Sequence, residues 1–231
     1  GATTHRLLSD PALLLGQCCG YDLVYGFSST LRLLGTPRYT TPGCAGTDYR
    51  SFVLARADAP ARDLADLRGG VCVVNGFASH SGTNAPRHLV APLSRDGRFF
   101  RQVVASGSHL ASLDLLRAGR ADVMAMDGVL HALLARDRPE ALAGTRILCQ
   151  TELVPTPPFV TAANSDPDAV DSLRAALADG FDDPDAADAK AELRLDGVSL
   201  LPMQDYARIV ELEAAALGHG YLEMHATTRA T

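Results

Sequence analysis

Continuous apolar runs alternate with segments of helical periodicity along most of the chain. A short unbroken apolar run bounded by turn residues predicts a buried strand, and apolar residues repeating every three to four positions predict an amphipathic helix. The expected strands lie at 12–16, 31–35, 51–55, 71–74, 99–105, 121–126, 146–149 and 159–162. The expected helices lie at 85–93, 109–118, 129–136, 167–180 and 204–217, with shorter helical turns near 20–22 and 64–67.

This order of elements predicts an α/β fold in which mostly parallel sheets carry helices on both faces. The segment from about Arg56 to Gln150 reads as a self-contained alternating unit inserted into the rest of the chain. We therefore expect two lobes, the first formed by 1–56 plus 151–231 and the second by 57–150, with a ligand cleft between them. In open α/β sheets, ligands bind at the carboxyl ends of the strands.

Two hydroxyl-rich loops lie at such strand ends, and each opens a predicted helix. The first contains Ser79, Ser81, Gly82 and Thr83, and the second contains Ser106, Ser108 and His109. Unpaired N–H groups and the positive end of the helix dipole make helix openings suitable for anions. Ser and Thr are also ordinary helix caps, so capping is the alternative role for each loop. Pro86 requires the first helix to start near Gly82 or Thr83, or to be distorted there.

Asp127 ends a predicted strand on the same edge, and it has two possible roles. Its carboxylate could accept a proton of a protonated oxyanion or pair with an ammonium group of the ligand, and either role would exclude sulfate. On spacing alone, a helix N-cap is an equally good interpretation. His109 at a helix N-terminus is expected to be neutral without ligand, and a bound anion would favour its protonation.

The charge balance narrows the kind of anion site. The 231 residues carry a net charge of −6, and Lys190 is the only lysine. An acidic chain of this kind argues against nucleic-acid binding, and the sequence has no run of eighteen apolar residues that would predict a membrane span. An anion would therefore be held locally, by backbone dipoles and hydroxyl groups. No spacing of metal ligands is present, and we expect neither a metal nor a cofactor.

Cysteine and tyrosine residues add weaker signals. Of the five cysteines, Cys19 and Cys44 lie in turn-like segments and could form a disulfide, although free thiols are an equal alternative. Tyr21 and Tyr49 lie in loops of the first lobe. Either could donate its hydroxyl to a ligand, and packing is the alternative role for each.

Several motifs together resemble the PhnD-like substrate-binding proteins of phosphate, phosphite and phosphonate ABC transporters, a branch of the type II periplasmic binding proteins. The matching segments are 16–21 (GQCCGY), 43–46 with 49–51, 66–69, 75–84 (NGFASHSGTN), 106–109 (SGSH), 119–127 and 158–161. They follow the family order through about two-thirds of the chain. Two departures stand out: Gly76 replaces the aspartate common in the family, and we expect no counterpart of the family's opening strand and helix before Ala12.

The resemblance implies a two-lobe, Venus-flytrap binder without catalytic activity. It implies that a phosphorus oxyanion is held by the two loops, through Ser79, Ser81, Gly82, Ser106, Ser108 and His109, with Thr83 in the first loop. It also implies that Asp127 holds a proton or amine of the ligand. Tyr21 and Tyr49 would contribute from the first lobe. The implied partners are a small oxyanion and a membrane permease, which would be the protein's only link to the membrane. A monomer and an extracytoplasmic location are expected, although no signal peptide is visible.

Two other functions stay open at this point. An enzyme on the same fold, such as those of menaquinone or thiamin-pyrimidine synthesis, would use His109 with Asp127, or Cys19, because these are the only candidate reactive groups. A sensor that passes ligand occupancy to a partner is the other. Phosphate, phosphite, methylphosphonate and aminoalkylphosphonates all fit the motifs.

Overall fold

The chain forms two compact units. The computed structural model describes residues 2–221, 224 and 226–229. Unit 1 consists of Gly1–Tyr49 and Leu153–Arg208, and unit 2 consists of Arg50–Glu152 and Ile209–Thr231. The chain therefore passes between the units after residues 49, 152 and 208. No helix within the described residues is long and apolar enough to cross a membrane.

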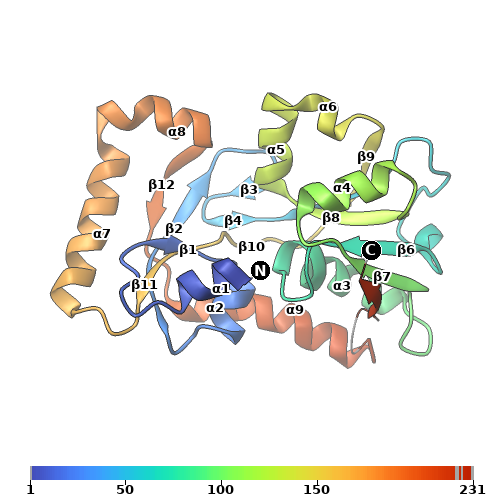
Figure 1. Ribbon diagram of the computed structural model, residues 1–231, viewed down its shortest axis with the longest axis horizontal. Helices are drawn as coiled ribbons and strands as arrows, with labels where there is room; N and C mark the ends of the chain where they lie inside the picture. The colour runs from blue at the N-terminus through green and yellow to red at the C-terminus, as the bar shows by residue number, and fades with distance from the viewer. Residues whose placement is uncertain (1, 222–223, 225, 230–231) are drawn as a thin grey trace. The chain divides into compact units, whose positions relative to one another are not determined.

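Unit 1 is built on a four-stranded sheet in the order β1-β11-β2-β12, in which every neighbouring pair is antiparallel. A second, small sheet has the order β10-β4-β3. The strands are β1 (Gly16–Gln17), β2 (Leu31–Tyr39), β3 (Cys44–Ala45), β4 (Asp48–Tyr49), β10 (Val154–Pro155), β11 (Phe159–Ala162) and β12 (Leu195–Ser199). The helical elements are α1 (Ala2–Leu8), α2 (Gly20–Tyr25), α7 (Pro167–Asp182), η4 (Pro184–Ala186), α8 (Ala187–Leu193) and η5 (Met203–Tyr206) (Figure 1).

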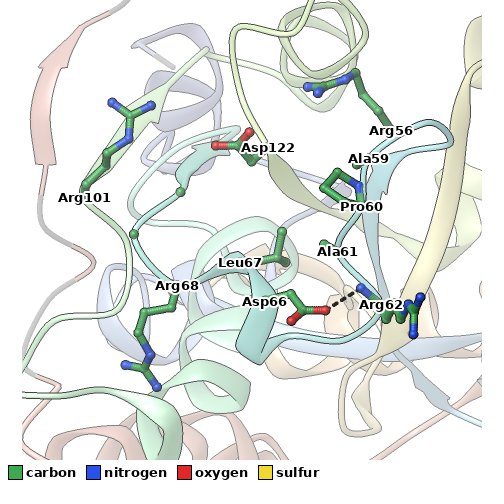
Figure 2. Close-up of a pocket in the computed structure, with 12 residues that line it drawn as sticks. Arg56, Ala59, Pro60, Ala61, Arg62, Asp66, Leu67, Arg68, Arg101 and Asp122 are labelled. Carbon is green, nitrogen blue, oxygen red and sulfur yellow. Dashed lines mark hydrogen bonds between the residues drawn. The ribbon is translucent and has the colours of Figure 1, made fainter.

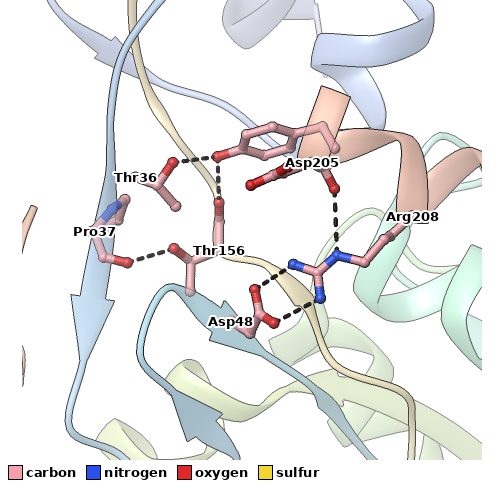
Figure 3. A network of polar contacts seen from close by, with 7 residues as sticks. Thr36, Pro37, Asp48, Thr156, Asp205 and Arg208 are labelled. Carbon is pink, nitrogen blue, oxygen red and sulfur yellow. Dashed lines mark hydrogen bonds and ion pairs between the residues drawn. The ribbon is translucent and has the colours of Figure 1, made fainter. Parts of the chain in front are cut away.

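A buried polar network fixes the middle of unit 1 (Figure 3). The Tyr206 hydroxyl is fully buried, lies 2.9 Å from Thr36 Oγ1 and donates to the Thr156 carbonyl at 3.2 Å. Thr156 Oγ1 in turn donates to the Pro37 carbonyl at 2.6 Å. Both hydroxyls thus have partners, which removes most of the cost of burying them.

Beside this network, Arg208 makes a two-pronged ion pair with Asp48. The Nη1 and Nη2 atoms of Arg208 each donate to one carboxylate oxygen at 2.7 Å. A fork-shaped guanidinium–carboxylate pair is stronger and more directional than a single contact. It ties the first turn of helix α9 (Ala207–Gly218) to strand β4 (Figure 3).

Unit 2 is built on a six-stranded sheet in the order β13-β7-β6-β8-β5-β9. Its strands are β5 (Ser51–Arg56), β6 (Val71–Val74), β7 (Gln102–Ala105), β8 (Val123–Asp127), β9 (Thr145–Gln150) and β13 (Ala226–Arg229). Its helical elements, besides α9, are η1 (Ala65–Leu67), η2 (His80–Asn84), α3 (Ala85–Val90), η3 (Ala91–Leu93), α4 (His109–Arg117), α5 (Gly128–Asp137) and α6 (Pro139–Leu142) (Figure 1).

Both faces of this sheet are covered, which explains the continuous apolar run of β6. Cys72 and Val74 pack in one apolar cluster with residues of α3 and α9, such as Val90 and Ala216. Val71 and Val73 point to the other face and pack with residues of α4 and α5: Leu113, Leu116 and Leu134. Because side chains alternate along a strand, only apolar residues at every position can satisfy two buried faces.

The expectation of mostly parallel sheets is wrong in part. Parallel pairing is confined to β13, β7, β6 and β8, whereas β5 runs antiparallel to both β8 and β9, and all pairs in unit 1 are antiparallel. An apolar run indicates that both faces of a strand are covered, but it does not indicate the direction of the neighbouring strands. Helices can cover both faces of an antiparallel sheet as well as those of a parallel one. The α/β class with helices flanking sheets is confirmed.

The element boundaries show where local signals misled. The expected strand at 12–16 is wrong, since only Gly16 of that run is in a strand, and Leu14 is 67 % exposed. Helix α7 continues through Gly180 to Asp182. The helices α1 and α8 and the strand β12 were not anticipated, because their sequences are polar or alanine-rich and lack a strong apolar period. The other expected strands and helices are present with small shifts at their ends.

The unit boundaries also differ from the expected lobes, 1–56 plus 151–231 and 57–150. Strand β5 belongs to unit 2 because it pairs with β8 and β9. Most of α9 also belongs there, because Asn84 Nδ2 donates to the Ile209 carbonyl at 3.0 Å and Arg87 forms a 2.9 Å ion pair with Glu213. These contacts join segments about 125 residues apart, which local sequence patterns cannot report.

Candidate functional site

The two hydroxyl-rich loops and Asp127 lie on one edge of the unit 2 sheet. Strands β7, β6 and β8 are parallel neighbours, so their carboxyl ends share that edge. The loop after β6 leads into η2, the loop after β7 into α4, and Asp127 leads directly into α5. We call this the carboxyl edge. Parallel pairing thus brings together three turns that are separated in the sequence.

The first loop opens a widened helical turn. Ser79 is its N-cap, and its Oγ accepts a hydrogen bond from Gly82 N at 3.2 Å. The Asn84 N–H donates to the Ser79 carbonyl at 3.0 Å, and the Ala85 N–H donates to the His80 carbonyl. These bonds span five residues, so η2 is a π-helical turn ahead of Pro86, which agrees with the expected distortion.

A close approach at Gly82 holds this loop against its neighbours. A Cβ at Gly82 would lie 1.9 Å from Asn75 Oδ1 and 3.3 Å from His109 Cε1. Thr83 Oγ1 donates to the Gly76 carbonyl at 2.7 Å and closes the loop on itself. Glycine is therefore required at position 82 for steric reasons.

The two loops are in contact. Ser81 Oγ lies 3.0 Å from His109 Nε2, across the carboxyl edge. His109 Nδ1 is buried and has no hydrogen-bond partner of normal geometry in the part of the chain that the structure describes. The expected adjacency of the two helix openings is therefore present, and contact of these residues with a ligand stays a prediction.

The two serines of the second loop have structural roles. Ser106 Oγ lies 2.7 Å from Ser112 Oγ and within hydrogen-bond distance of the Val74 and Ser108 carbonyls. Ser108 is the N-cap of α4, where its Oγ accepts from Ala111 N at 3.1 Å. Ser106 braces the loop, whereas the hydroxyl proton of Ser108 is not used by its cap bond.

His109 is neutral at pH 7. Burial lowers its pKa to about 4, and the carbonyl of Ala125 opposes this shift. The expected neutral state therefore has desolvation as its main cause rather than the helix dipole. His80, one residue into η2, is also buried, and its pKa is lowered to about 4 by the same cause.

Asp127 caps α5. Its Oδ1 accepts from Val129 N at 2.8 Å and from Leu130 N at 3.0 Å, while Oδ2 makes no hydrogen bond within the described residues. Burial raises the pKa of this carboxyl, and the two N–H donors act in the opposite direction. The cap role is thus observed, and it leaves one oxygen for a second partner.

Tyr21 and Tyr49 belong to unit 1. The Tyr21 ring lies 4.6 Å, centroid to centroid, from the ring of Tyr25 on the same helix, and Tyr49 is buried in β4.

Cys19 and Cys44 are thiols rather than a disulfide, and Cys44 Sγ lies 3.2 Å from Thr41 Oγ1. In the described residues, no group of three or more His, Cys, Asp or Glu side chains could hold a metal ion.

Asn75 was not among the expected site residues. It directly follows β6, and its Oδ1 is buried, unpartnered among the described residues and adjacent to Gly82. Its position directly after a buried strand could have predicted it as a site residue. Its contact with Gly82 depends on how the loop folds back.

Residues 32–206 match the sequence model of a family described as the periplasmic substrate-binding proteins of phosphonate ABC transporters. The chain belongs to this family. A substrate-binding protein of this kind delivers a solute to a membrane permease, and its family is periplasmic and is not a class of enzymes. No match was found among curated protein sequences.

Solved structures with a similar fold include other binding proteins. PA3383 from Pseudomonas aeruginosa, a binding protein component of an ABC phosphonate transporter, is 16% identical, with a TM-score of 0.78 over 95% of this chain and 74% of that one. XAC2383 from Xanthomonas citri bound to ATP is 19% identical, with a TM-score of 0.71 over 95% and 83%. PhnD1 from Prochlorococcus marinus (MIT 9301) in complex with methylphosphonate is 12% identical, with a TM-score of 0.73 over 87% and 77%. At these identities the likeness concerns the fold.

Proposed function

We propose that this substrate-binding protein captures a small phosphorus oxyanion (a phosphonate, phosphite or phosphate) at the carboxyl edge of unit 2, as a monomer. The observation that carries the proposal is the 3.0 Å contact between Ser81 and His109, which brings two helix openings together. Their backbone N–H groups and hydroxyls offer several donors to one anion. The family assignment is independent support, since its transporters carry phosphonates.

The proposed donors are the hydroxyls of Ser79, Ser81 and Ser108 and the N–H groups around Gly82. Thr83, whose hydroxyl proton already bonds the Gly76 carbonyl, closes the first loop, and Ser106 braces the second. If His109 carries its proton on Nε2, it donates to Ser81 Oγ, and the Ser81 hydroxyl proton is then available to the ligand. Neither loop contains a lysine or arginine. The site would therefore neutralise an anion with oriented dipoles in a desolvated setting, where each is worth more than in water.

Asp127 is proposed to select the protonation state of the ligand. Its unused Oδ2 can accept a P–OH proton or pair with an amine, and it would repel a fully ionised tetrahedral anion. A role of Tyr21 and Tyr49 in ligand binding, which the family resemblance implies, stays a prediction.

A ligand panel tests this proposal directly. Methylphosphonate, an aminoalkylphosphonate, phosphite and phosphate are compared in a thermal-shift assay, with sulfate as the control anion. A ligand at a hundredfold its dissociation constant adds about 2.7 kcal/mol to the free energy of unfolding, which corresponds to a rise in Tm of roughly 5–10 °C. If none of these anions raises Tm more than sulfate does, the proposal is wrong.

Substitutions then locate the site. Ser81→Ala and His109→Ala are each expected to weaken binding by about 10- to 100-fold, since a hydrogen bond to a charged group is lost. Ser94→Ala is the matched control, because Ser94 also uses its hydroxyl in a local bond, to the Ala91 carbonyl at 2.7 Å. Phosphorus NMR after prolonged incubation should show the ligand intact. Conversion of the ligand would favour an enzyme instead.

A further inference from the structure

A pocket lies on the edge of the unit 2 sheet opposite the carboxyl edge. Its volume is about 700 Å³. Gly70 precedes β6, Arg101 precedes β7 and Asp122 precedes β8, so the pocket opens at the amino ends of the same parallel strands. We call this the amino edge. The other lining residues are Arg56, Ala59, Pro60, Ala61, Arg62, Asp66, Leu67, Arg68 and Gly69 (Figure 2).

Two arginines at this pocket have unused side chains. Arg62 and Arg101 are exposed, and neither guanidinium makes a hydrogen bond or an ion pair with any residue that the structure describes. Figure 2 shows Arg101 on one side of the pocket and Arg56 and Arg62 on the other. A guanidinium presents several donors in a fixed plane and suits phosphate oxygens.

The other two arginines are partly or wholly engaged. Arg56 Nε lies 3.3 Å from the exposed carboxylate of Asp58, and its Nη1 donates to the Ala121 carbonyl at 3.2 Å. Arg68 donates to the Leu93 carbonyl and lies 5.2 Å from the centre of the Phe99 ring. Arg56 can turn from an exposed partner toward a ligand, whereas Arg68 is fixed in the wall.

The two aspartates of the pocket hold its backbone. Asp66 Oδ2 accepts from Arg62 N at 2.7 Å, and Asp122 Oδ2 accepts from Val71 N at 2.7 Å. Both carboxylates lower the local positive potential, but neither forms an ion pair with a pocket arginine. Four arginines against two aspartates line this pocket in a protein whose net charge is −6.

We infer that the amino edge of unit 2 is a second anion site, which takes a small molecule bearing two or more linked phosphoryl groups. Because the guanidiniums lie on opposite sides of the pocket (Figure 2), a ligand with negative charge at both ends suits it better than one compact oxyanion. A chain of phosphoryl groups can contact both sides. Pro60, Ala61 and Leu67 supply apolar wall between the charges, where an organic part of such a molecule can rest.

Inorganic triphosphate is the probe for this site, with binding measured by calorimetry at low salt. The double variant Arg62→Gln/Arg101→Gln should weaken triphosphate binding by at least about tenfold, since two charge-assisted contacts are removed. Arg95→Gln/Arg98→Gln is the matched control, because these two exposed arginines of unit 2 do not line the pocket. It should change the affinity by less than about twofold.

The variant Ser81→Ala separates this inference from the proposed function. It should leave triphosphate binding unchanged, and Arg62→Gln/Arg101→Gln should leave methylphosphonate binding unchanged. The inference is overturned if the unmodified protein does not bind triphosphate at about 1 mM, a weak affinity of about −4 kcal/mol. It is equally overturned if the control double variant loses as much affinity, or if Ser81→Ala abolishes triphosphate binding.

Discussion

The two edges of the unit 2 sheet offer contrasting environments to an anion. At the carboxyl edge, the loops supply hydroxyl groups, backbone N–H groups and a neutral His109, with no arginine or lysine in either loop. At the amino edge, four arginines surround an open pocket. The same parallel strands β6, β7 and β8 support both edges.

On the two proposals above, one sheet holds negative charge by two physical means. Oriented dipoles in a buried turn are fixed by the backbone, so they act over a short range and select by shape and protonation state. Exposed guanidiniums act over a longer range but are screened by salt and adapt to many anions. A change that weakens binding at one edge and leaves binding at the other unchanged therefore distinguishes the two edges.

Acid should have the largest effect, through the buried imidazoles beside the carboxyl edge. Burial lowers the pKa of His80 and of His109 to about 4, from an ordinary value of 6.5. Between pH 6.5 and 4 the unfolded chain binds protons that the folded chain cannot. The free energy of unfolding therefore falls as the pH drops through this window, by about 3 kcal/mol for each histidine.

Urea unfolding at pH 7, 6, 5 and 4 checks this expectation. The variant His109→Gln should show a shallower loss of stability than the unmodified protein. Asp127, whose raised pKa gives a stabilising proton uptake in acid, works in the opposite direction. A stability that stays constant down to pH 4 would contradict burial of the two neutral imidazoles.

The next largest effect is expected for Gly82→Ala. The added methyl would lie 1.9 Å from Asn75 Oδ1, so the first loop must shift. We expect methylphosphonate binding to weaken by about 100-fold and the free energy of unfolding to fall by about 1–3 kcal/mol. Calorimetry and urea unfolding measure the two changes.

Gly76→Ala is the control for this substitution. No atom lies within 4 Å of a Cβ built at Gly76, in the same loop. Its binding and stability should stay close to those of the unmodified protein, and triphosphate binding should be unaffected in both variants. Equal losses in the two alanine variants would show that the close approach at Gly82 is unimportant.

A smaller effect is expected for Asp127→Asn. Asparagine caps a helix about as well as aspartate, so stability should change by less than about 0.5 kcal/mol. The negative charge is lost, however, and the preference for methylphosphonate over sulfate should fall about tenfold. Competition binding measures the ratio, with Asp166→Asn, the N-cap of α7 in unit 1, as the matched control. An unchanged ratio would restrict Asp127 to capping.

Salt should have the smallest effect at the carboxyl edge and a clear one at the amino edge. Between about 0.05 and 0.5 M salt, triphosphate binding should weaken about tenfold because exposed charges are screened. Methylphosphonate binding should change by less than about twofold over the same range, because the proposed donors there carry no net charge and Ser81 and Gly82 are buried. Titrations of both ligands at several salt concentrations test this, and equal slopes would remove the distinction between the two edges.

Much of unit 2 followed from local patterns in the sequence. The apolar runs of β6 and β8 act over a few residues and are present as expected. The serine and aspartate caps of η2, α4 and α5, which the sequence offered as the alternative role of these residues, are local too and are observed. The distortion imposed by Pro86 was also a local effect. The family resemblance rested on motifs of the same range, and the match over residues 32–206 bears it out.

Tertiary structure alone decided the rest, because it depends on contacts between distant segments. Strand β5 joins unit 2 through pairing with β8 and β9, and α9 is held there by Asn84 and Arg87. The antiparallel pairing of the unit 1 strands could not be predicted from their apolar runs. A strand that is covered on both faces is apolar at every position whether its neighbours run parallel or antiparallel to it. The close approach of Gly82 to Asn75 and His109 arises only when the loops at the carboxyl edge fold together. Arg56 and Arg62 meet Arg101 at one pocket because β5 runs antiparallel to β8, which puts the end of β5 at the amino edge.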